Sequence, residues 1–90
     1  MTRRKEFKKV EKALLAWIKK IRNIKVMKEP LYSVDYVIDK SNARYLEFRY
    51  DSDIYEIVNG YKEKDLHHKF IGLLQKYNGE FETYSIVRFY

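Results

Sequence analysis

Apolar side chains recur every three or four residues through the first 24 positions of this 90-residue chain. This spacing places them on one face of a helix and predicts an amphipathic helix over residues 4–24. The apolar face comprises Phe7, Val10, Leu14, Trp17, Ile18, Ile21 and Ile24. At 90 residues the chain is too short for two independent cores, so we expect a single domain over residues 1–90.

The opposite face of the predicted helix is rich in lysine. Residues 1–29 contain eleven Lys and Arg against three acids, whereas residues 30–90 contain eight against ten. Acidic partners four residues away are largely missing, so the helix tolerates self-repulsion, which favours a polyanionic partner over a merely solvated face. We therefore expect nucleic acid to contact Arg3, Arg4, Lys5, Lys8, Lys9, Lys12, Lys19 and Lys20.

The segment after this helix has the patterns of a β-sheet. Ile24–Lys28 alternates and is expected to be a short strand that ends before Pro30. Tyr32–Asp39 and Arg44–Tyr50 are alternating runs rich in β-branched and aromatic residues, which predicts a hairpin. Ile54–Val58 is either a further short strand or an irregular stretch that leads into a turn.

The last third of the chain predicts a helix and a strand. Asp65 is a suitable N-cap for a helix that ends near Tyr77, and Asn78-Gly79 is a typical C-terminal stop. Thr83–Tyr90 is expected to be a strand buried on both faces. The whole pattern indicates an α+β domain.

Burial limits the hairpin to two registers, in which Tyr36 pairs with Leu46 or with Phe48. Asp35 then lies across from Glu47 in the first register and from Arg49 in the second, with Cβ atoms roughly 5 Å apart. Two carboxylates so placed can hold Mg²⁺ or Mn²⁺, and the neighbouring cation can stabilise charge on a scissile phosphate. The alternative is cross-strand salt bridging on an exposed sheet face.

The same residues resemble a known signature. The run from Val34 to Ile38, followed by Leu46-Glu47-Phe48-Arg49, resembles the PD-(D/E)xK nuclease motif, with Asp35 as its first acid and Glu47-Phe48-Arg49 at its E-x-K position. Within that superfamily the chain is similar to archaeal Holliday-junction resolvases, which open with a helix that carries an acid, as Glu11 does here. Two departures are the arginine in place of lysine and the absence of a proline before Asp35.

The resemblance implies a restriction-endonuclease-like core with the order helix, three strands, helix, strand and a mixed sheet. It also implies a homodimeric, metal-dependent endonuclease that acts on structured or branched DNA. Glu11, Asp35, Glu47 and Arg49 would be its catalytic residues, and Asp35 and Glu47 would ligate Mg²⁺ or Mn²⁺. Because arginine is always protonated, Arg49 can stabilise charge but cannot act as a base, which predicts reduced or lost activity.

Two other functions fit the same sequence. One is a non-catalytic basic nucleic-acid-binding protein, and the other is a small viral or mobile-element protein that binds and inhibits a host protein. The absence of cysteine excludes disulfides, thiolate metal sites and cysteine nucleophiles. No apolar run approaches the roughly 18 residues of a membrane span, and the first residues lack an apolar signal core, so a cytoplasmic protein is expected.

Overall fold

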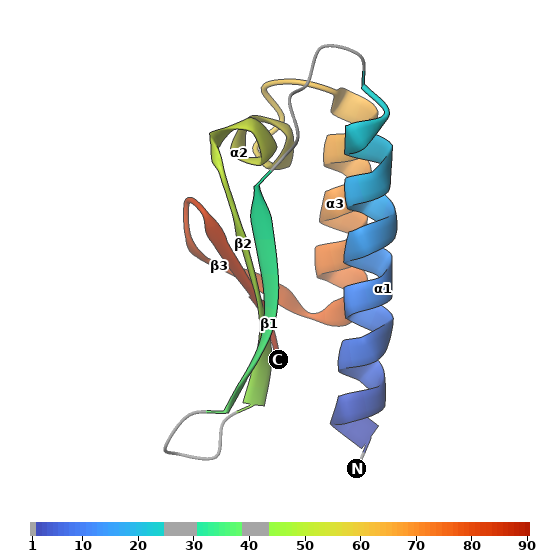
Figure 1. The fold of residues 1–90 in the computed structure, drawn as a ribbon, viewed down its shortest axis with the longest axis vertical. Coiled ribbons are helices and arrows are strands. Elements are labelled where there is room, and N and C mark those ends of the chain that lie inside the picture. The colour runs from blue at the N-terminus through green and yellow to red at the C-terminus, as the bar shows by residue number, and fades with distance from the viewer. Residues whose placement is uncertain (1, 25–30, 39–43) are drawn as a thin grey trace.

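The computed structural model describes residues 2–24, 31–38 and 44–90, with the backbone alone described for residues 2–5 and 38. It has two layers, a β-sheet and a pair of long helices that cover one face of that sheet (Figure 1). The elements in chain order are α1 (Thr2–Arg22), β1 (Tyr32–Ile38), β2 (Arg44–Tyr50), α2 (Ser52–Val58), α3 (Lys64–Tyr77), β3 (Gly79–Thr83) and β4 (Ile86–Phe89). The predicted α+β class is confirmed.

Within the described residues the sheet contains four strands in the order β1-β2-β4-β3, and every neighbouring pair is antiparallel. The prediction of a mixed sheet was therefore wrong. The chain forms two hairpins, β1–β2 and β3–β4, which join through β2 and β4. The segment predicted as one strand, Thr83–Tyr90, contributes β4 and the turn before it, and Gly79–Thr83 pairs with β4 as an edge strand.

The segment Ile54–Val58 is helical, although its β-branched residues suggested a strand or an irregular stretch. Asp51 caps this helix, because its side-chain Oδ1 accepts a hydrogen bond from the Ile54 N–H at 3.1 Å. Ile54, Ile57 and Val58 have the spacing of one helical face and are buried there. Capping and tertiary burial thus outweigh the β-propensity of the side chains. The strand predicted at Ile24–Lys28 falls on residues 25–28, outside the described part of the chain.

The core lies between the sheet and the helices, as the apolar face of α1 predicts. The indole Nε1 of Trp17 donates a 2.8 Å hydrogen bond to the Leu66 carbonyl, and its ring centroid lies 4.7 Å from that of Phe70. Through these contacts α1 packs against α3. The β1–β2 register pairs Tyr36 with Leu46, the first of the two expected registers, and it places Leu46, Phe48 and Tyr50 in the core.

Candidate functional site

The structure places Asp35 and Glu47 directly across from each other in β1 and β2. Val34 and Phe48, their neighbours along the strands, pack in or against the core, so Asp35 and Glu47 point to the sheet face that α1 and α3 leave open. Asp35 is exposed, whereas Glu47 is buried and only 5% of its surface remains accessible to solvent. The cross-strand carboxylate pair expected from the sequence is therefore present.

Both oxygens of the Glu47 carboxylate are held by arginines. Arg49 Nε donates to Oε2 at 2.7 Å, and Arg88 Nε donates to Oε1 at 3.1 Å. The Arg88 guanidinium also lies 4.5 Å from the centroid of the Tyr45 ring and 3.7 Å from Oε2 of Glu82. Glu47 thus connects β2 to β4 through an ionic cluster, which we call the Glu47 cluster and define as Glu47, Arg49 and Arg88.

The pKa of the Glu47 carboxyl reflects two opposing effects. Burial raises it, but the hydrogen bonds and charges of Arg49 and Arg88 together outweigh burial and hold the pKa below its ordinary value. Folding therefore favours the ionised form of the Glu47 carboxyl over the protonated form.

We expect the Glu47 cluster to make the fold acid-sensitive. A carboxyl whose pKa is depressed by folding contributes stability above its unfolded-state pKa, near 4.5, and loses that contribution as pH falls through the lower folded-state value. Glu47→Gln should cost about 1–2 kcal/mol at pH 7, because it removes the charge and replaces one of the two acceptor oxygens with an NH2 group, which cannot accept from an arginine. Urea unfolding at pH 7 and pH 3 should show a smaller pH dependence for Glu47→Gln than for wild type. Equal pH dependence in both proteins would contradict this role.

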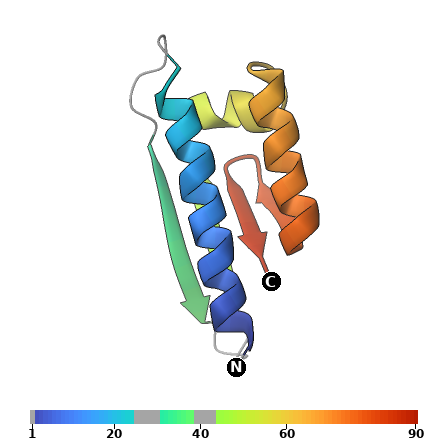
Figure 2. The same ribbon diagram turned by 90° about the vertical axis from the view of Figure 1, so that its right-hand side faces the viewer.

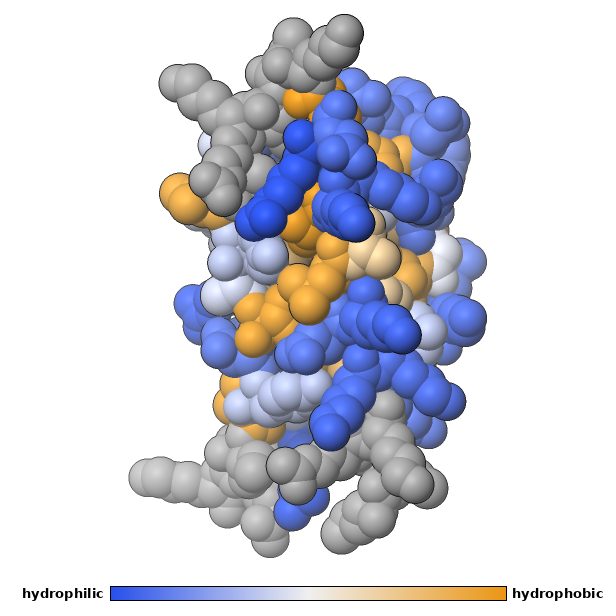
Figure 3. Space-filling view, turned by 45° about the vertical axis from the view of Figure 1, so that its right-hand side comes forward, coloured by the Kyte–Doolittle hydropathy of each residue, from blue (hydrophilic) through white to orange (hydrophobic). Residues whose placement is uncertain are grey.

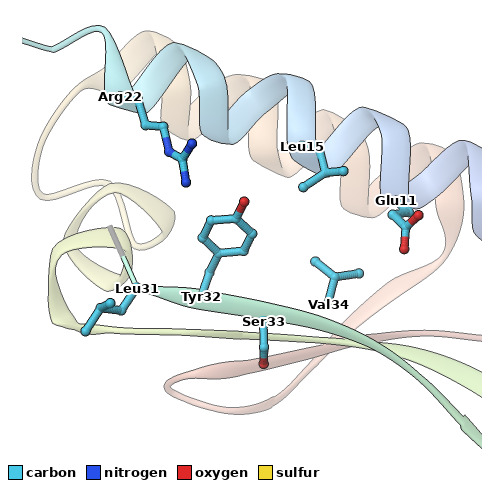
Figure 4. Close-up of a pocket in the computed structure, with 7 residues that line it drawn as sticks. All are labelled: Glu11, Leu15, Arg22, Leu31, Tyr32, Ser33 and Val34. Carbon is cyan, nitrogen blue, oxygen red and sulfur yellow. The ribbon is translucent and has the colours of Figure 1, made fainter. Parts of the chain in front are cut away.

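Glu11 lies on the other side of the sheet from Asp35 and Glu47. It lines a groove between α1 and β1 together with Leu15 and Val34 (Figure 4). Since Val34 and Asp35 are consecutive in a strand, their side chains point to opposite faces. The structure therefore brings together Asp35, Glu47 and Arg49 of the predicted catalytic set and places Glu11 apart from them.

These side chains do not fit a resident divalent cation as they are arranged. Asp35 is one donor, but both oxygens of Glu47 already accept hydrogen bonds from arginines, and Mg²⁺ would have to displace those cations. Among the described residues, no group of three or more His, Cys, Asp or Glu side chains could hold a metal ion. On the open sheet face, Glu47 accordingly forms ion pairs with Arg49 and Arg88.

The helical layer presents a second candidate site. Lys8, Lys9, Lys12, Lys19 and Lys20 are exposed on α1, as the sequence predicts. The structure adds Lys69 and Lys76, which are exposed on α3, and α3 lies beside α1 in the same layer (Figure 2). We call these seven residues the helical lysine surface. Arg3, Arg4 and Lys5 belong to the first turns of α1, and their side chains lie outside the described part of the structure.

Lysines of α1 lie close to lysines of α3 where the two helices pack against each other. Lys9 and Lys76 line the same hollow, which has a volume of about 450 Å³ and also includes Glu6. Lys20 lies within hydrogen-bonding reach of Lys69, and this contact, with the charge of Lys69, lowers the pKa of the Lys20 ammonium. No described carboxylate forms an ion pair with any of the seven lysines. An incoming anion would relieve this repulsion.

Sequence reasoning missed Lys69, Lys76 and Arg88 as members of these sites. Lys69 and Lys76 are seven residues apart, or about two helical turns, so their shared face could be read from the sequence. Their position beside α1 could not, because it depends on how α1 and α3 pack. Arg88 is 41 residues from Glu47 and meets it only through the β2–β4 pairing.

Comparisons of the chain with family models, with curated proteins and with solved structures find no match. No helix in the described residues has the length and apolar character needed to span a membrane. The function is therefore inferred from the geometry of the two sites.

Proposed function

We propose that this protein binds nucleic acid, most readily duplex DNA, through the helical lysine surface. The observation that carries the proposal is the gathering of seven exposed lysines from two packed helices, none of them paired with a described carboxylate. Nucleic-acid phosphates are the polyanion that such a surface suits best, because binding releases condensed counterions and relieves the repulsion between the lysines.

The shape of this surface favours contacts with the backbone over readout of bases. The 21 residues of α1 span about 31 Å, which matches roughly nine base pairs of a duplex. Because α1 and α3 lie side by side in one layer, a duplex would meet lysines from both helices. Phosphate contacts position a protein on a duplex without specifying its sequence. We therefore expect affinity that depends strongly on salt and weakly on sequence.

A pair of charge-matched variants tests the proposal. Lys8→Gln with Lys12→Gln removes two charges from the helical lysine surface. Lys62→Gln with Lys64→Gln removes one charge from the connection before α3 and one from the first residue of α3, so each variant changes the net charge from +6 to +4. Fluorescence anisotropy with a labelled duplex, repeated at several salt concentrations, gives the slope of the logarithm of the binding constant against the logarithm of the salt concentration. The first variant should lower the magnitude of that slope by about 1.8, or roughly 0.9 for each lost phosphate contact.

The second variant should leave the salt slope close to that of wild type, because its lysines lie outside the proposed interface. Circular dichroism of both variants checks that the helices are intact. Equal losses of affinity would mean that only net charge matters, and unchanged affinity in the first variant would exclude the helical lysine surface as the binding site.

The endonuclease function implied by the sequence resemblance is a second candidate. One observation favours it, the direct pairing of Asp35 with Glu47 beside Arg49. The restriction-endonuclease-like fold, the homodimer and the Mg²⁺ or Mn²⁺ requirement stay predictions that belong to this candidate. It further requires that Glu11, on the other face of the sheet, be dispensable.

Cleavage assays decide this second candidate. Four-way and flap DNA are incubated with the protein and Mg²⁺ or Mn²⁺, and Asp35→Asn is the diagnostic variant. Asp35 is exposed, so its replacement leaves the Glu47 cluster in place and separates catalysis from folding. Metal-dependent cleavage that Asp35→Asn abolishes would establish the nuclease. Cleavage by neither protein would remove it and leave DNA binding as the function.

A further inference from the structure

Three tyrosine rings meet where α2 lies beside the turn between β3 and β4, on the opposite side from α1 in the view of Figure 1. The ring centroid of Tyr55 in α2 lies 6.3 Å from that of Tyr61 and 6.0 Å from that of Tyr84. Tyr61 belongs to the connection between α2 and α3, and Tyr84 belongs to the β3–β4 turn. We call these three residues the tyrosine patch.

Backbone hydrogen bonds hold the segments that carry the tyrosine patch. The N–H of Tyr61 donates to the Glu56 carbonyl at 2.8 Å, which folds the connection back onto α2. The N–H of Tyr50, at the end of β2, donates to the Ser85 carbonyl at 3.1 Å, which holds the β3–β4 turn next to the start of α2. The positions of the rings therefore follow from the fold.

Two of the three rings stay largely in solvent. Tyr84 is 76% exposed and Tyr61 is 71% exposed, whereas Tyr55 packs against the core. Among the described residues, no Lys or Arg lies over any ring of the tyrosine patch, although the Arg88 guanidinium lies over the ring of Tyr45. The patch thus offers aromatic faces to a ligand from outside the chain.

The chain around the tyrosine patch is acidic. Residues 51–65 contain five acids against two lysines, although the whole chain has a net charge of +6. Glu56 forms an ion pair with Lys62 at 2.8 Å, and Asp53, in the same helix as Tyr55, has no ion-pair partner among the described residues. These three charged groups leave one net negative charge beside the rings, which attracts a cation.

We propose that the tyrosine patch binds an arginine side chain from a basic segment of a partner protein. The negative face of an aromatic ring attracts a cation, and the planar guanidinium stacks on such a face. Arginine is also more weakly hydrated than lysine, so it loses less when it leaves water. Rings from three segments of the chain, together with the acids of α2, supply both kinds of attraction.

Charge argues for this occupant over nucleic acid and over a second copy of the chain. Bases also stack on tyrosine, but their phosphates would meet the excess of acids in residues 51–65. Two copies, each with a net charge of +6, repel each other. The helical lysine surface lies on the helical layer, where hydrophilic side chains cover much of the molecule (Figure 3). Nucleic acid and the basic segment would therefore bind to different surfaces.

A pair of short peptides tests this inference. The probe is blocked Gly-Gly-Arg-Gly-Gly, and the control carries citrulline, a neutral side chain of the same shape, in place of arginine. Titration of the ¹⁵N-labelled protein should give the probe an affinity about tenfold higher than that of the control, because citrulline lacks the charge that the rings and acids attract. Amide shifts should concentrate at residues 53–62 and 84–85.

Substitutions in and beside the tyrosine patch should change probe affinity in opposite directions. Tyr84→Leu removes an aromatic face and should weaken binding about two- to fivefold, whereas Tyr84→Phe keeps that face and should bind like wild type. Lys62→Gln should strengthen binding about two- to fivefold, because it releases Glu56 from an exposed ion pair. Circular dichroism checks that each variant folds, and both Tyr84 variants should keep the DNA affinity of wild type.

Four results would overturn the inference. The first is equal affinity for the two peptides, and the second is a set of peptide-induced shifts away from the tyrosine patch. The third is binding of single-stranded oligothymidine that Tyr84→Leu weakens, which would show that bases occupy the patch. The fourth is sedimentation of wild type as a dimer that Tyr84→Leu dissociates, which would assign the patch to a second copy.

Discussion

Replacing Phe48 by alanine is expected to lower the free energy of unfolding by about 3–5 kcal/mol. Phe48 is fully buried. The centroid of its ring lies 6.5 Å from the ring centroid of Trp17 in α1, 6.0 Å from that of Phe70 in α3 and 5.1 Å from that of Tyr50. It therefore connects both helices to the sheet. A domain of 90 residues has a total stability of about 5–13 kcal/mol, so this loss would leave a marginal fold.

Phe81→Ala is the matched control for Phe48→Ala, because it makes the same chemical change at a side chain that is 48% exposed. We expect it to cost less than about 1 kcal/mol. Urea unfolding followed by circular dichroism gives both values. Similar costs for the two substitutions would contradict the position of the core, and DNA binding by the Phe48→Ala protein should fall in proportion to its unfolded fraction.

Replacing Gly79 by alanine is expected to cost about 1–3 kcal/mol, because the new methyl group has no room. A Cβ at this position would lie 2.6 Å from Cδ2 of Leu74 and 2.6 Å from Cε2 of Phe89. Phe89 is fully buried and Leu74 is nearly so, so neither side chain can move into solvent. Gly79 therefore lets β3 begin directly against the end of α3.

Gly72→Ala is the matched control for Gly79→Ala and should have the opposite sign. Gly72 lies inside α3, and a Cβ there would meet nothing within 4 Å. Alanine should stabilise the protein by about 0.5–1 kcal/mol, since it restricts the unfolded chain and favours the helix. Thermal unfolding of the two variants measures the difference, and destabilisation by both would contradict the packing described for Gly79.

The elements that the sequence predicted correctly are those with a strong local pattern. The apolar spacing of α1 and the alternation of β1 and β2 each follow from a single short segment. The chosen register, Tyr36 with Leu46, was one of two that burial allowed, and it gave the Asp35–Glu47 pair. Local patterns failed at Ile54–Val58, where the Asp51 cap and burial favour a helix.

The membership of the two sites depended on contacts between distant segments. Glu11 lies apart from Asp35 because α1 covers the apolar face of the sheet, where Val34 lies, and the alternation of β1 directs Asp35 to the other face. Arg88 reaches Glu47 only because β4 pairs with β2, and Lys69 joins Lys20 only because α3 packs beside α1. A sequence pattern can identify the charged face of a helix, but the packing decides what lies next to it.

We propose that nucleic acid binds to the helical lysine surface and leaves the open face of the sheet uncovered. Titration of the ¹⁵N-labelled protein with a short duplex, followed by amide chemical shifts, tests it most directly. Shifts should concentrate at residues 8–20 of α1 and around Lys69 and Lys76 of α3, while Asp35, Glu47 and Arg88 stay unperturbed. Shifts centred on Asp35 and Glu47 with α1 and α3 unchanged, or no shifts at all, would contradict it.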